Sequence, residues 1–108
     1  MLINLDEGLA RVRGNKALYT RMLSMFIDSK EVLQLETFLA EGNVVDAAGA
    51  AHSIKGIAGN LSLSELFNIS NTLTEELRKG IISDDTVASY RSTLTETQKA
   101  VNDVIATL

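Results

Sequence analysis

The chain has 108 residues, of which 45% are apolar, and its formal net charge is −4. This length supports a single folded domain spanning residues 1–108. An acidic chain lacks the basic patches that nucleic acid or an anionic membrane surface requires, so we expect neither partner. Cysteine is absent, which excludes disulfides, thiolate metal sites and cysteine catalysis and fits a reducing compartment. No apolar run approaches the ~20 residues of a membrane span and no signal peptide is visible, so we expect a cytoplasmic protein.

The sequence contains no proline, and strand-forming residues are not grouped into alternating runs, so we expect an all-α fold. Gly42-Asn43 and Gly80 suit the left-handed position that follows a helix. A third break is expected at 60–64, and a fourth, weaker one at 14–15. These breaks predict a short helix over 4–13, then longer helices over 16–41, 44–60, 62 or 64 to 79, and 84–107. Because the connections are short, we expect an up-down-up-down antiparallel four-helix bundle with a short extra N-terminal helix.

Apolar residues at helical spacing identify the core face expected of each helix. For 16–41 this core stripe comprises Leu18, Met22, Met25, Phe26, Val32 and Leu33. For 44–60 it comprises Val44, Ala47, Ala51, Ile54, Ala58 and Leu61, and for 64–79 it comprises Leu66, Ile69, Leu73 and Leu77. Leu23 and Ile27 fall off the first stripe, where they could border a docking patch beside His52 or contact the N-terminal helix.

The only histidine, His52, lies in the helix over 44–60. At ~100° per residue it lies roughly 130° from the centre of the core stripe, so we expect it to point to solvent. Three glycines inside this helix each cost ~1 kcal/mol relative to alanine, which indicates that another protein must approach the imidazole closely. Lys55, one turn later, places a cation where a phosphoryl oxygen could accept a hydrogen bond. The small residues around His52 are Ala48, Gly49, Gly56 and Gly59.

An exposed neutral imidazole is a nucleophile that can accept a phosphoryl group. The chain has no glycine-rich nucleotide loop, no carboxylate cluster for Mg²⁺, and no second histidine or cysteine that could complete a metal site with His52. We therefore expect a phosphocarrier and not an enzyme with a complete active site of its own. The plainer interpretations are that His52 is an inconsequential surface histidine, that Lys55 is simply solvated, and that the glycines allow close helix packing.

The segment His52–Gly56, followed by Gly59, Asn60 and Leu61, resembles the motif of histidine-containing phosphotransfer (HPt) domains of two-component phosphorelays. The similar N-terminal domain of chemotaxis histidine kinases shares this motif. The resemblance implies a four-helix bundle in which His52 is the phosphoacceptor, Lys55 stabilises the phosphoryl group, and the small residues keep access clear. It also implies response regulator receiver domains and a hybrid sensor histidine kinase as partners. Mg²⁺ is then expected on the receiver, the chain itself needs no cofactor, and we expect a monomer.

Two positions depart from the family pattern. Members usually have glycine where Ser62 stands, and many carry a glutamate after a leucine where Thr74 follows Leu73. Glu75 is the next residue, about 100° further round the helix, so an orienting glutamate has no direct counterpart here.

Two other functions remain open at this point. One is a helical adaptor that docks receiver domains without being phosphorylated. The other is a kinase dimerisation domain, but that class follows its histidine with an acidic residue and an Arg-Thr-Pro sequence, and neither occurs here.

Overall fold

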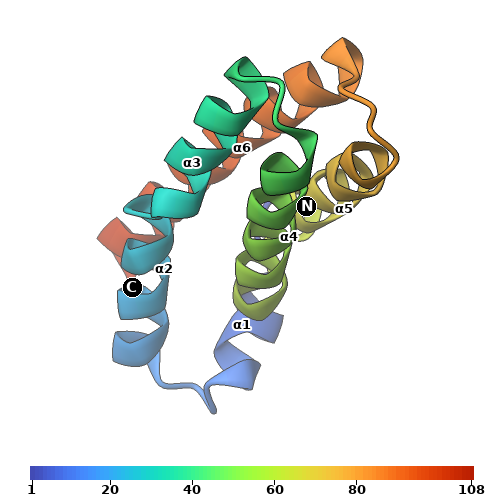
Figure 1. The fold of residues 1–108 in the computed structure, drawn as a ribbon. Coiled ribbons are helices and arrows are strands. Elements are labelled where there is room, and N and C mark those ends of the chain that lie inside the picture. The colour runs from blue at the N-terminus through green and yellow to red at the C-terminus, as the bar shows by residue number, and fades with distance from the viewer.

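The computed structural model describes residues 1–108 and contains helices but no strands, which confirms the all-α fold. The molecule is elongated, with extents of 40 × 20 × 19 Å. None of its helices combines the length and the apolar character that a membrane crossing requires. The helices are α1 (Leu5–Arg11), α2 (Lys16–Ile27), α3 (Lys30–Ala40), α4 (Val44–Leu61), α5 (Ser64–Arg78) and α6 (Asp84–Thr107) (Figure 1).

The four-helix bundle with a short N-terminal helix is confirmed, although its first arm consists of two helices, α2 and α3. Helix α4 packs against α3 on one side and α5 on the other, and α6 closes the bundle by packing against α5 and α2. Helix α1 contacts α2 and the C-terminal end of α4, as Figure 1 shows at the base of the bundle. Helix α4 is therefore held on several sides.

The predicted continuous helix over 16–41 is wrong, because the chain breaks between α2 and α3 at Asp28 and Ser29. Ser29 is extended, with φ −62° and ψ 122°, and its Oγ donates a hydrogen bond of 2.8 Å to Glu31 Oε2. This bond lowers the pKa of Glu31. Aspartate and serine favour helix ends because their side chains compete for local backbone groups.

The core stripe predicted for the first arm is also wrong, apart from Phe26, which is buried. Met25 and Leu33 are 67% and 73% exposed, Leu18 is exposed, and Met22 and Val32 are half-buried. The break at Asp28 and Ser29 resets the helical phase, so one stripe cannot serve both helices. The residues that α2 and α3 bury are Tyr19, Leu23, Phe26, Leu35 and Leu39.

The core faces of α4 and α5 largely follow the predicted periodicity. Val44 and Ile69 are the two members of these stripes that remain half-buried. The buried members are Ala47, Ala51, Ile54, Ala58 and Leu61 on α4, and Leu66, Leu73 and Leu77 on α5. The predicted left-handed turns at Gly42 and Gly80 are confirmed, with φ of 68° and 79°.

The N-terminal segment fastens the C-terminal end of α4. Ser62 adopts a left-handed conformation with φ 59° and ψ 38°, which ends the helix. Its Oγ donates a hydrogen bond of 2.8 Å to Glu7 Oε1, and its carbonyl accepts one of 2.9 Å from the Asn4 amide. The buried Tyr19 hydroxyl donates a bond of 2.7 Å to the Leu61 carbonyl. The two bonds to the Ser62 and Leu61 carbonyls satisfy backbone groups that a helix end leaves without intrahelical partners.

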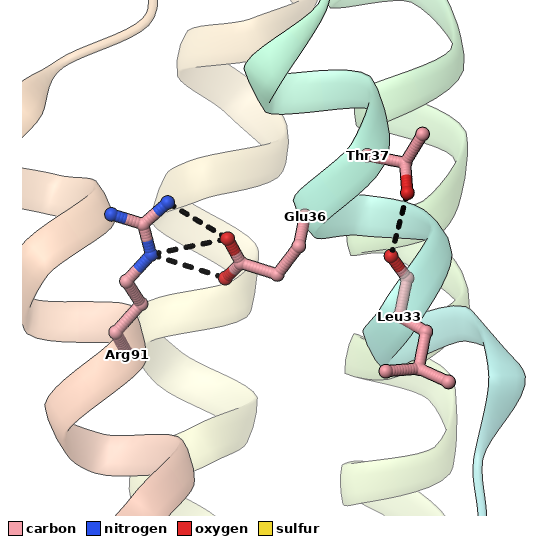
Figure 2. A network of polar contacts seen from close by, with 4 residues as sticks. All are labelled: Leu33, Glu36, Thr37 and Arg91. Carbon is pink, nitrogen blue, oxygen red and sulfur yellow. Dashed lines mark hydrogen bonds and ion pairs between the residues drawn. The ribbon is translucent and has the colours of Figure 1, made fainter.

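An ion pair links α3 to α6, whose backbones make no close contact. Figure 2 shows Arg91 facing Glu36, with Nη2 2.8 Å from Oε2 and Nε 3.1 Å from Oε1. Both side chains are substantially exposed, so the pair contributes at most about 1 kcal/mol to stability.

Candidate functional site

Helix α4 begins at a well-formed cap that fixes where His52 lies. The Asn43 side chain accepts a hydrogen bond of 3.1 Å from the Asp46 amide, and its Nδ2 donates one of 2.7 Å to Asp46 Oδ2. Asp46 also places a negative charge in the first turn, where it interacts favourably with the positive end of the helix dipole. From this cap the helix runs 18 residues to Leu61, so His52 sits near its middle.

His52 is exposed on the outer face of α4, as the periodicity predicted. The His52 side chain makes no hydrogen bond or ion pair with any other residue of the chain. A partner can therefore approach the imidazole from solvent. We call the exposed side of α4 the His52 face, and it comprises Val45, Asp46, Gly49, His52, Ser53, Gly56 and Asn60.

Two of the four small residues predicted to give access do border open space. A β-carbon added at Gly49 or Gly56 would meet no atom within 4 Å. Ala48 is different: it is only 6% exposed and belongs to the core, so its predicted role in partner access is wrong. The reason is that α3 and α5 cover both flanks of α4, which makes the buried arc wider than the predicted stripe.

Gly59 borders a side chain and not solvent alone. A β-carbon there would lie 3.3 Å from Cδ2 and Cε2 of Phe67 on α5. The missing side chain at Gly59 therefore makes room for an aromatic ring within this domain. The interpretation of these glycines as helix-packing residues applies to Gly59, whereas Gly49 and Gly56 leave open surface.

Lys55 lies half-buried at the edge of the His52 face, one turn after the histidine. Its ammonium nitrogen is 5.5 Å from the centroid of the Phe67 ring. None of the ion pairs of the chain includes Lys55. No acidic group of the domain therefore neutralises its charge at short range.

Phe67 is the residue that the sequence analysis missed. It is 37% exposed, although it follows the fully buried Leu66 on α5. Its signal in the sequence is an aromatic residue one position off the apolar stripe of an amphipathic helix. That signal alone does not indicate a role for Phe67, because its contacts with Gly59 and Lys55 depend on how α5 packs on α4.

The two predicted docking residues have different positions. Leu23 is fully buried at the centre of the core, so its predicted docking role is wrong. Ile27 is half-buried and packs against the core, and its docking role stays a prediction.

A cleft of about 300 Å³ lies between α2 and α4, and two methionines that were expected in the core, Met22 and Met25, line it instead. It is lined by Met22, Met25, Phe26, Ser29, Glu31, Ile57, Asn60 and Leu61.

The position at which many HPt domains carry a glutamate is turned into the core. Thr74 is 2% exposed, and its Oγ1 donates a hydrogen bond of 2.7 Å to the Ser70 carbonyl. Glu75 is exposed on another side of α5. No three histidine, aspartate or glutamate side chains lie close enough together to hold a metal ion.

No family model, curated protein or solved structure matches the chain. The resemblance to HPt domains therefore depends only on the sequence of the residues around His52.

Proposed function

We propose that this chain is a histidine phosphotransfer protein of a two-component phosphorelay. It accepts a phosphoryl group on His52 and passes it to another protein. The observation that carries the proposal is the setting of His52 on α4. The only histidine is exposed, open positions at Gly49 and Gly56 flank it, and an ammonium without an acidic partner lies one turn away.

The transfer needs only a neutral imidazole and an activated phosphoryl group in line with it. A ring nitrogen of His52 uses its lone pair to form a bond to phosphorus. The bond from phosphorus to the aspartyl oxygen of a phosphorylated receiver breaks, and the aspartate leaves as a carboxylate. The imidazole becomes a phosphorylated imidazolium, whose proton can pass to solvent. Transfer to a second receiver reverses these changes.

Lys55 supplies positive charge to the phosphoryl oxygens during this transfer. Side chains three residues apart on a helix have β-carbons about 5–6 Å apart, so the ammonium can reach a group held on His52. Hydrogen bonds from an ammonium to phosphate oxygens are charge-assisted and stronger than neutral ones. Since no acid pairs with Lys55, no existing ion pair has to break.

The partners of this proposal are response regulator receiver domains and a hybrid sensor histidine kinase, and the proposed location of this chain is the cytoplasm. The receiver contributes the acceptor aspartate and Mg²⁺, and the chain acts as a monomeric carrier and not as an enzyme. The open surface at Gly49 and Gly56 supports close approach of such a domain. The cleft between α2 and α4 borders the His52 face at Asn60 and adds apolar surface at Ile57 and Met25.

The test is transfer from phosphorylated receiver domains to the purified chain, with His52→Gln as the matched control. Because His52 is exposed, the variant should fold normally, which circular dichroism checks. We expect label on the wild type and none on His52→Gln. Label that persists on His52→Gln would refute the assignment. Receiver binding without any label on the wild type would instead support the non-phosphorylated adaptor.

A further inference from the structure

Lys55 and Phe67 form a contact that the proposed function does not require. The Lys55 ammonium lies 5.5 Å from the centroid of the Phe67 ring, within the distance at which a cation is attracted to an aromatic face. The ring comes from α5, whereas Lys55 and His52 belong to α4. The contact therefore ties the position of the lysine to the packing between the two helices.

Gly59 makes the position of this ring possible. A β-carbon at Gly59 would lie 3.3 Å from two carbons of the Phe67 ring, so the ring would have to move. Gly59 follows Lys55 by four residues and His52 by seven, which places all three on one side of the helix. Lys55, Gly59 and the Phe67 ring therefore lie together along one border of the His52 face.

A free lysine side chain samples many rotamers, and holding its ammonium in one region has an entropic cost. A ring beneath the ammonium reduces this freedom without neutralising the charge, unlike a carboxylate. We propose that Phe67 is a positioning residue that holds the Lys55 ammonium beside His52, ready to pair with the transferred phosphoryl group. This inference rests on the proposed function, because it assigns Phe67 a part in the same transfer.

The expected effect on the rate follows from the usual strength of a cation–aromatic contact at a partly exposed site. Loss of such a contact should slow phosphorylation of His52 by about two- to five-fold. The effect should require Lys55, because the ring acts only through the ammonium. It should also appear with a small donor, because no partner protein then contacts Phe67.

The experiment uses phosphoramidate as the donor and compares wild type, Phe67→Leu and Phe67→Trp, each also in a Lys55→Met background. In this reaction the phosphorus–nitrogen bond of phosphoramidate breaks, ammonia leaves, and a bond forms from the imidazole nitrogen to phosphorus. Leucine keeps the apolar bulk but lacks an aromatic face, whereas tryptophan restores the face. Proton NMR of the Lys55 ε-methylene group reports in parallel whether the ammonium lies over a ring.

We expect Phe67→Leu to slow labelling about two- to five-fold and Phe67→Trp to restore the wild-type rate. The loss should disappear when Lys55 is already methionine. The ring current should shift the Lys55 ε-protons upfield in the wild type but not in Phe67→Leu.

Equal ε-proton shifts in both proteins, or a Phe67→Leu loss that persists without Lys55, would overturn the positioning role. Both outcomes leave labelling of His52 intact. Absence of labelling on the wild type would overturn the proposed function together with this role.

Discussion

Replacing Gly56 with alanine should separate the stability of the domain from its ability to meet a partner. A β-carbon at this position meets no atom within 4 Å, so the methyl group causes no overlap inside the domain. Alanine is more favourable than glycine in a helix interior by ~1 kcal/mol. We therefore expect the free energy of unfolding to rise by ~1 kcal/mol. For a domain near this size, this corresponds to a rise in Tm of roughly 4–8 °C.

The larger substitution Gly56→Leu should leave the domain folded but slow transfer from a phosphorylated receiver. A displacement of the reacting groups by about 1 Å can reduce a reaction rate up to about 100-fold, so we expect transfer to slow roughly 10- to 100-fold. Labelling by phosphoramidate should change little, because a small donor reaches His52 without a docked protein surface.

Thermal melts and the two labelling assays measure these effects, and Gly59→Ala is a matched control. Its β-carbon would lie 3.3 Å from the Phe67 ring, so its gain in stability should be smaller than that of Gly56→Ala. A lower Tm for Gly56→Ala would show that this glycine packs internally. Unchanged receiver transfer with Gly56→Leu would show that the partner docks elsewhere.

Three further substitutions test the packing. The hydroxyl of buried Tyr90 has no hydrogen-bond partner, so Tyr90→Phe should raise the free energy of unfolding by ~1 kcal/mol in urea titrations. Burial raises the pKa of Tyr90 above 10.0, so stability should fall as pH rises past 10, and less so in Tyr90→Phe. Gly8→Ala should lower stability by ~1–3 kcal/mol in thermal melts, because its β-carbon would overlap the Tyr19 hydroxyl. Ser62→Gly removes the strain of a left-handed φ of 59° but also loses the hydrogen bond to Glu7. A double-mutant cycle should therefore show that Ser62→Gly raises the free energy of unfolding by ~1 kcal/mol only when Glu7 is already alanine.

The sequence was most informative where local patterns decide the structure. The stripe from Ala47 to Leu61 was predictable because one long helix keeps a single phase, and this phase also determines that His52 is exposed. The turns at Gly42 and Gly80 were predictable because glycine adopts positive φ with little strain.

The remaining features depend on contacts between distant residues. The break at Ser29 involves neither glycine nor proline, so its signal is weak, and missing it gave the first arm the wrong phase. Tyr19 is buried in the core, and its hydroxyl bonds to the Leu61 carbonyl, 42 residues away in the sequence. Phe67 gains significance only from its packing against Gly59 and Lys55.

The left-handed position of Ser62 has a similar origin. A serine with φ 59° is unusual, since this conformation favours glycine, which is the residue that HPt domains usually have there. Hydrogen bonds from Ser62 Oγ to Glu7, and from the Asn4 amide to the Ser62 carbonyl, compensate for the strain. Serine at this position is therefore compatible with the left-handed end of α4.

The most direct test of the phosphocarrier function is the chemical stability and location of the transferred phosphate. The wild type and His52→Gln would be labelled by a receiver domain, divided between acid and base, and analysed by mass spectrometry of peptides covering α4. The proposed function predicts one phosphoryl group on His52 of the wild type, stable in base and lost in acid, and none on His52→Gln. A phosphate that survives acid, maps to another residue, or remains on His52→Gln would contradict it.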